Sequence, residues 1–153
     1  MTTDILATPR RQPRLPVAAA TDFGRGERRD VRRPTILVID DDRTNLKLAR
    51  YILEADGFAV EEAVDAITAF EVLKTCNPAL IVTDIQLPGM DGWELTRRLK
   101  ANFATQHIPI VAVTAYGVEG DREQAIAVGA ADYVQKPIST LELPSIIRKH
   151  LRE

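Results

Sequence analysis

The chain has 153 residues, of which 45% are hydrophobic and 27% are charged. These values are typical of one globular domain, and they exclude a collagen-like chain, a wholly disordered chain and a disulfide scaffold. Cys76 is the single cysteine, so no internal disulfide can form, and we expect a cytoplasmic protein. No apolar run reaches the roughly 18 residues of a membrane span, so no membrane partner is expected.

The net charge of −2 is unevenly distributed along the chain. Residues 1–33 contain eight arginines and four acidic residues and show no apolar periodicity, whereas residues 34–153 carry a net charge of −6. Because the first segment has too little apolar surface to offset the entropy of ordering, we predict a disordered Arg/Pro-rich arm over 1–33 and a folded domain over 34–153. Arginine-rich arms can bind nucleic acid, but the interspersed acids argue against nucleic acid as a partner.

From Thr35 on, the hydrophobic pattern predicts strands and helices in alternation. Thr35–Ile39 is a short, β-branched, apolar run, which is typical of a strand buried on both faces. The expected strands span residues 35–39, 58–61, 79–83, 108–113 and 131–135. The spacing of apolar residues predicts helices around 46–53 and over 66–73, 93–103, 121–128 and 140–151. The first of them should end at Asp56-Gly57, and Asp65 can cap the second.

Such alternation predicts an α/β fold, a three-layer doubly wound sandwich with a five-stranded parallel sheet. Periodicity alone does not give the strand order. Two orders are common for doubly wound sheets, and five strands fit the shorter, flavodoxin-like order 2-1-3-4-5.

Polar side chains that could carry chemistry follow four of the five expected strands. They are Asp40, Asp41 and Asp42 after the first, Asp84 after the third, Thr114 after the fourth and Lys136 after the fifth. In open α/β sheets, ligands bind beyond the carboxyl ends of the strands. Each residue alone could be a helix cap or a turn residue, and for Asp42 a cap is as good an interpretation as a chemical role. Polar residues at the ends of four strands at once favour a functional site over a set of unrelated caps and turns.

The expected charges of this site indicate a metal and a reaction class. At least two carboxylates from the first strand converge with Asp84, and like charges that close need compensation. Lys136 supplies one positive charge, which leaves room for a hard divalent cation, and oxygen ligands without His or Cys favour Mg²⁺ over zinc. A metal, a lysine and a threonine hydroxyl around one carboxylate are what phosphoryl transfer needs, with an aspartate as the nucleophile.

Four segments resemble the signature motifs of response regulator receiver domains of the CheY-like superfamily. They are residues 36–42 (ILVIDDD), 82–92 (VTDIQLPGMDG), 113–115 (VTA) and 133–137 (YVQKP). The resemblance spans residues 35–151 and implies the strand order 2-1-3-4-5. Because no output domain follows Lys136 in this sequence, we expect a single-domain regulator of the DivK type, a signalling module rather than an enzyme.

The resemblance also implies a role for each site residue. Asp84 would accept a phosphoryl group from a phosphohistidine of a histidine kinase or a histidine phosphotransfer protein, and Lys136 would pair with it. The implied protein ligands of Mg²⁺ are Asp40, Asp41, Asp84 and the backbone carbonyl of Gln86. Thr114 and Tyr133 would switch the face made by residues 121–151 for a downstream protein target, although from the residues alone Tyr133 is better explained as a core aromatic. The bond between Lys136 and Pro137 would be cis.

One other enzyme class fits part of the pattern. Residues 36–44 also match the Asp-x-Asp-x-Thr motif of haloacid-dehalogenase-type phosphatases, with Asp40 as nucleophile and Asp42 as acid/base. That interpretation lacks the later acidic pair that holds Mg²⁺ in those enzymes, and it leaves Asp84 without a role. A flavodoxin-like nucleotide binder is disfavoured because three carboxylates occupy the loop that would cradle phosphate.

The sequence also suggests what limits the lifetime of a phosphoryl group. Gln86 and Tyr116 should border the approach of an in-line water to Asp84. Tyr116 is bulky, so we expect it to slow hydrolysis, and Tyr116→Ala to speed dephosphorylation several-fold. The sequence leaves open which kinase and which target the chain meets, and whether it forms a homodimer.

Overall fold

The computed structural model describes residues 33–115 and 120–151. Pro34 and the residues that follow form a compact unit. The disordered arm predicted for 1–33 lies outside the described residues, except for Arg33. Within the described ranges, no helix is long and apolar enough to cross a membrane.

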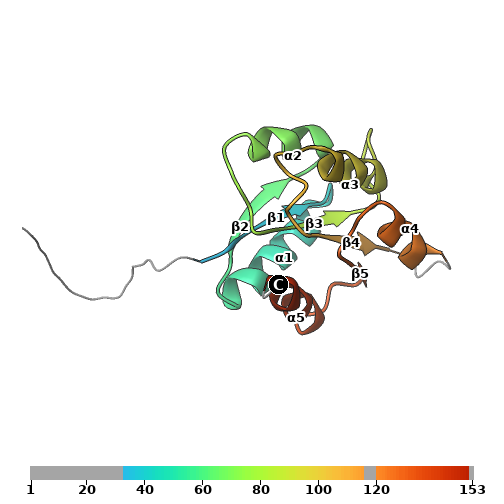
Figure 1. Cartoon of the computed structure of the whole chain (residues 1–153). Coiled ribbons are helices and arrows are strands. Elements are labelled where there is room, and N and C mark those ends of the chain that lie inside the picture. Colours follow the sequence, from blue (N-terminus) through green and yellow to red (C-terminus); the bar gives the residue numbers. More distant parts are fainter. Residues whose placement is uncertain (1–32, 116–119, 152–153) are drawn as a thin grey trace, which may run out of the picture. The chain divides into compact units, whose positions relative to one another are not determined.

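Five strands and five helices alternate along the described chain, as the pattern predicts (Figure 1). In chain order they are β1 (Thr35–Ile39), α1 (Arg43–Ala55), β2 (Ala59–Ala63), α2 (Ala66–Leu73), β3 (Leu80–Asp84), α3 (Gly92–Ala101), β4 (Ile110–Thr114), α4 (Asp121–Ala127), β5 (Asp132–Gln135) and α5 (Glu142–Leu151).

The sheet has the order β2-β1-β3-β4-β5, and all four strand pairs are parallel. Figure 1 shows α2 and α3 on one face of the sheet and α1 and α5 on the other. The predicted doubly wound sandwich with the order 2-1-3-4-5 is therefore confirmed.

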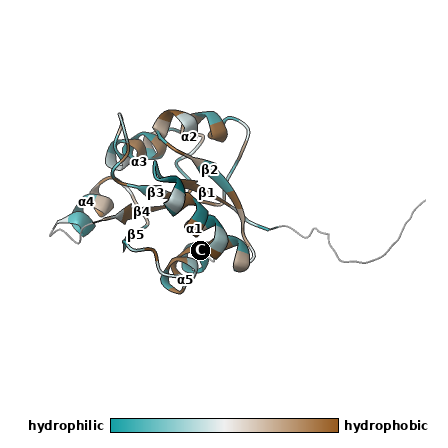
Figure 2. Ribbon diagram, turned by 180° about the vertical axis from the view of Figure 1, so that it is seen from behind, coloured by the Kyte–Doolittle hydropathy of each residue, from teal (hydrophilic) through white to brown (hydrophobic). Residues whose placement is uncertain are grey.

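Two apolar clusters hold these layers together, one on each face of the sheet. Alternate side chains of the central strands point to opposite faces, so both clusters draw on the same strands. One includes Val38, Val82 and Val111 with Leu46 of α1 and Ile147 of α5. The other includes Leu37, Ile39, Ile81, Leu95 of α3 and Ala69 of α2. Figure 2 shows the central strands in the brown of apolar residues, as expected for a sheet covered on both faces.

Element ends differ from the predicted ones by one to two residues, for local reasons. The second strand runs to Ala63 instead of 61, because all five of its residues pair with Thr35–Ile39. The final helix begins at Glu142 instead of 140, because the Ser139 hydroxyl accepts hydrogen bonds from the N–H groups of Leu141 and Glu142. The first helix ends as predicted, where Gly57 adopts a positive φ of 95°.

Candidate functional site

The strand register brings the predicted polar residues to one edge of the sheet. Ile39 is opposite Thr83, so the next residues, Asp40 and Asp84, reach the same level. Asp84 is in turn opposite Val113, and Thr114 is opposite Gln135, so that Thr114 and Lys136 extend to about this level. The site is therefore a direct result of parallel pairing among the four strands concerned.

Two carboxylates of this edge are buried around one lysine. Asp40 and Asp84 have exposed fractions of 4% and 5%. The Lys136 ammonium lies 3.1 Å from Asp84 Oδ2 and 3.3 Å from Asp40 Oδ2. The peptide bond that follows Lys136 is cis, as the resemblance implies. One positive charge thus faces two buried negative charges.

Burial and pairing act on these groups in opposite directions. Burial raises the pKa of Asp84, and the hydrogen bonds from Lys136 and from the Gln86 N–H offset this effect only in part. Burial alone would lower the pKa of Lys136, but the hydrogen bond and the charge of Asp84, with the charge of Asp40, raise it. Lys136 therefore stays protonated. The negative charge of ionised Asp84 is compensated only in part by this ammonium.

A third carboxylate completes an oxygen cluster that fits a divalent cation. One carboxylate oxygen from each of Asp40, Asp41 and Asp84 lies within 4.8 Å of the others. Asp41 is exposed, unlike the other two, so the cluster opens to solvent on its side. Three carboxylates against one ammonium leave a negative excess, and an all-oxygen donor set suits Mg²⁺.

Hydrogen bonds from the backbone fix how the two buried carboxylates lie. The Asp42 N–H donates to Asp40 Oδ1 over 2.9 Å, and the Gln86 N–H donates to Asp84 Oδ1 over 3.2 Å. Gln86 thus begins its loop beside Asp84, with an exposed side chain. The ligand role implied for its carbonyl remains a prediction.

Asp42 does not join this cluster and instead caps α1. Its side chain accepts a hydrogen bond from the Thr44 N–H over 2.9 Å, and its backbone is extended as in other helix caps. The phosphatase alternative, in which Asp42 is the acid/base, is not supported. It also assigns no role to Asp84, which lies at the centre of the site.

The two residues expected to switch have different surroundings. Thr114 is 6% exposed, and its hydroxyl donates to Asp121 Oδ2 of α4 over 3.1 Å, which links the strand end to α4. Tyr133 is half-buried and lines a surface cavity between α4 and α5, and the switch role that the resemblance implies for it remains a prediction. Tyr116 lies outside the described residues.

Sequence reasoning missed a glycine on which the geometry of the site depends. A Cβ atom on Gly92 would collide with the backbone carbonyl oxygen of Asp84 and would lie 2.7 Å from the Ile85 Cα. The Gly92 N–H also donates to the Ile85 carbonyl over 2.8 Å. The first residue of α3 therefore packs directly against the backbone of Asp84. Gly92 stands within a quoted motif, but only the fold reveals its contact.

Comparison with known proteins identifies one family. The sequence profile of the family described as the response regulator receiver domain matches residues 36–148 of this chain. Among curated relatives, the phosphate regulon transcriptional regulatory protein PhoB of Rhizobium meliloti is 41% identical over 119 residues, which cover 78% of this chain and 52% of PhoB. The chain thus spans about half the length of that relative. The polar-differentiation response regulator DivK of Brucella ovis is 34% identical over 117 residues, covering 76% of this chain and 95% of DivK.

Solved structures agree with this result. The receiver domain of sensor histidine kinase PA1611 from Pseudomonas aeruginosa superposes with a TM-score of 0.73 at 30% identity, covering 80% of this chain and 100% of that one. In that structure a magnesium ion is coordinated in the active site cleft. The described site and the matched residues coincide, since Asp40, Asp84 and Lys136 all lie within 36–148.

Proposed function

The chain belongs to the response regulator receiver family, and we propose that it accepts a phosphoryl group on Asp84 from a phosphohistidine of a histidine kinase or a histidine phosphotransfer protein. The observation that carries this proposal is the position of Asp84. Its carboxylate is buried at a strand end, contacts Lys136, and shares an oxygen cluster with Asp40 and Asp41.

In the proposed reaction, a carboxylate oxygen of Asp84 attacks the phosphorus of the phosphoimidazole. A phosphorus–oxygen bond forms as the phosphorus–nitrogen bond breaks, and the electron pair returns to the imidazole, which takes up a proton. The product is an acyl phosphate on Asp84 and a neutral histidine on the donor. Lys136, held by Asp84 and Asp40, is placed to neutralise charge on the transferred oxygens.

Asp40, Asp41 and Asp84 would hold Mg²⁺, with the Gln86 carbonyl as a further ligand. When bound, the ion supplies positive charge to the phosphoryl oxygens. The chain contributes the fixed orientation of the two buried carboxylates, which the N–H groups of Asp42 and Gln86 maintain. The negative excess of the cluster supports this assignment.

We further propose that Thr114 and Tyr133 transmit phosphorylation to the surface made by α4, β5 and α5, where a downstream protein binds. A phosphoryl group on Asp84 offers the Thr114 hydroxyl a charged acceptor in place of Asp121. Because Asp121 is the first residue of α4, a change of partner at Thr114 would alter how α4 is held. Tyr133 is only half-buried at this surface, so its side chain can change conformation when α4 is held differently.

The test is intact-mass spectrometry after treatment with acetyl phosphate and Mg²⁺. We expect one phosphoryl group per chain in the wild type, none in Asp84→Asn, and undiminished labelling in Asp42→Asn, a matched variant whose asparagine can still cap α1. Labelling that persists in Asp84→Asn but disappears in Asp40→Asn would contradict the proposal and identify Asp40 as the acceptor.

A further inference from the structure

A cavity of about 510 Å³ lies at the edge of the sheet opposite to the Asp84 site. Ala79, Pro109 and Ala131 line it, and each directly precedes a strand, namely β3, β4 and β5. Because the strands are parallel, their amino ends share this edge, whereas Asp84 ends β3 at the other. The volume is within the range of small-molecule sites. We call it the amino-edge cavity.

The side chains of this lining that can carry a charge are all basic. They are Lys100 near the end of α3, His107 of the loop that follows α3, and His150 near the end of α5. None of the described residues that line the cavity is acidic. This contrasts with residues 34–153 as a whole, which carry a net charge of −6. The lining therefore suits an anion.

The ammonium of Lys100 is half-buried and has no anionic partner in the described part of the chain. Lys100 Nζ donates to the carbonyls of Gln106 over 3.0 Å and of Ile108 over 2.7 Å, which uses two of its three protons. Both carbonyls flank His107, so the ammonium lies beside the backbone of that residue. Burial lowers the pKa of Lys100, because nothing of opposite charge offsets its desolvation.

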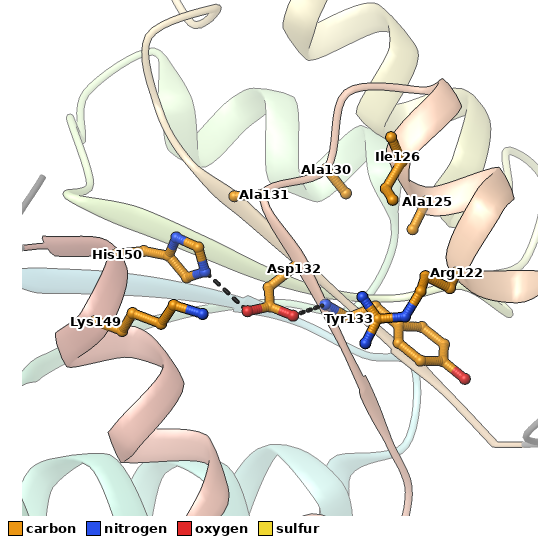
Figure 3. Close-up of a pocket in the computed structure, with 9 residues that line it drawn as sticks. All are labelled: Arg122, Ala125, Ile126, Ala130, Ala131, Asp132, Tyr133, Lys149 and His150. Atoms are coloured by element: carbon orange, nitrogen blue, oxygen red, sulfur yellow. Dashed lines mark hydrogen bonds and ion pairs between the residues drawn. The ribbon is translucent and has the colours of Figure 1, made fainter.

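His150 is oriented by a carboxylate outside the lining. Its Nε2 lies 2.9 Å from Asp132 Oδ2, and its other ring nitrogen, Nδ1, faces away from Asp132 (Figure 3). Burial opposes ionisation of Asp132, but the hydrogen bonds from His150 and from the Tyr133 N–H lower its pKa. Nδ1 is thus left for a ligand, and in the protonated ring it donates. His107 is exposed, so a ligand reaches it from solvent.

The rest of the lining is apolar and comes from Ala79, Pro109, Ala131 and Leu151. Ala131 is exposed, and the other three are half-buried. An inorganic ion bound to the basic groups would leave this apolar wall in water. A ligand with an apolar body covers the wall and gains the free energy of removing it from water.

We propose that the amino-edge cavity binds a small organic anion. Its acidic head pairs with Lys100 and the two histidines, and its apolar body packs on Pro109, Ala131 and Leu151. Carboxylate and phosphate heads share this chemistry, since both accept charge-assisted hydrogen bonds. The inference does not depend on phosphoryl acceptance, because the cavity and Asp84 lie at opposite edges of the sheet.

The probes are 2-naphthoate, 2-naphthyl phosphate and the neutral 2-naphthamide, which share one rigid ring system. In Mg²⁺-free buffer at neutral pH, both anions should shift amide signals of the ¹⁵N-labelled full chain at residues 100, 107–110, 131 and 150–151. The signals of 40–42 and 84–86 should stay in place. 2-Naphthamide should bind about tenfold more weakly or less, because it brings no charge to Lys100. The anion that binds more tightly identifies the head as a carboxylate or a phosphate.

Two variants test the basic groups separately. Lys100→Gln removes the charge and keeps a donor, and it should weaken the binding of 2-naphthoate about tenfold or more. His107→Glu reverses the preference of the lining at an exposed position and should weaken binding by a similar factor, without touching the loop that Lys100 holds. Lys74→Gln is the matched control. Lys74 also ends a helix, but its ammonium pairs with Glu71 over 3.0 Å, so affinity should change less than about twofold.

Equal binding of 2-naphthamide and the two anions would overturn the proposal, and so would equal weakening by Lys74→Gln and Lys100→Gln. Shifts at 40–42 and 84–86 in place of the cavity residues would also overturn it. Inorganic phosphate that binds as tightly as 2-naphthyl phosphate would refute the role of the apolar wall. A chain that binds 2-naphthoate but never accepts a phosphoryl group on Asp84 would refute the proposed function alone.

Discussion

The backbone carbonyl oxygen of Asp84 occupies the space in which a Cβ atom on Gly92 would stand. The start of α3 can approach the end of β3 this closely only because residue 92 has no side chain. Backbone atoms cannot rotate away as a side chain can, so a larger residue must displace α3 or the end of β3.

Gly92→Ala should therefore lower the free energy of unfolding by about 1–3 kcal/mol, as overpacking of a core does. It should also weaken Mg²⁺ binding, because Asp84 moves with its carbonyl. Urea unfolding and Mg²⁺ calorimetry measure the two effects. Gly57→Ala is the control. Gly57 has a positive φ of 95°, which strains an alanine, but the added Cβ atom would have no neighbouring atom within 4 Å. This variant should therefore destabilise the chain without changing its affinity for Mg²⁺. Unchanged Mg²⁺ binding in Gly92→Ala would disprove the positioning role.

A second prediction concerns the pH dependence of stability without Mg²⁺. Because burial raises the pKa of Asp84 above its ordinary value of 3.8, the folded chain binds this proton more tightly than the unfolded chain does. The contribution of Asp84 to stability is thus full below that value, and it is lost as the pH rises through the folded pKa.

Asp84→Asn should remove this loss, so that its stability relative to the wild type increases from acidic to neutral pH. Urea unfolding in buffers that contain a chelator measures the difference. A stability difference between Asp84→Asn and the wild type that is independent of pH would count against the prediction.

Much of the site was predictable because its determinants are local in the sequence. Asp40, Asp84 and Thr114 each stand at the end of an apolar run and Lys136 follows the last expected strand, and in a parallel sheet such ends share an edge. The strand order is not local, because it depends on which strands pair across long connections. The resemblance to receiver domains supplied it.

What the sequence could not predict depends on contacts between distant elements. Nothing near Asp41 distinguishes it from Asp40, yet one is exposed and the other buried. The approach of Gly92 to Asp84 and the contact between His150 and Asp132 arise from packing of helices on the sheet. The residues alone favoured a core position for Tyr133 and the resemblance a switch role; because β5 is an edge strand, Tyr133 is half-buried.

A third prediction concerns where the folded domain begins. The Ala59 N–H donates to the Pro34 carbonyl over 2.9 Å, and the Ala79 N–H donates to the Thr35 carbonyl over 2.8 Å. A chain that begins at Arg33 keeps both bonds, so its urea unfolding should match the full chain within about 0.5 kcal/mol, and it should still accept a phosphoryl group.

A chain that begins at Ile36 is the matched control. It loses both carbonyl acceptors and should be less stable by about 1–3 kcal/mol. Equal loss of stability in the two shortened chains would show that residues before Arg33 contribute to folding.

The last prediction concerns Lys136, whose ammonium is shared by two buried carboxylates. Lys136→Met leaves Asp40 and Asp84 facing each other without that cation, and in Mg²⁺-free buffer it should lower the free energy of unfolding by about 1–3 kcal/mol. The same change removes the positive charge nearest to the carboxylate cluster. Mg²⁺ should therefore bind several-fold more tightly and restore most of the lost stability. Calorimetry and urea unfolding with and without Mg²⁺ test both effects, with Lys47→Met as the exposed control. Weaker Mg²⁺ binding in Lys136→Met than in the wild type would show that Lys136 orients the carboxylates more than it competes with the metal.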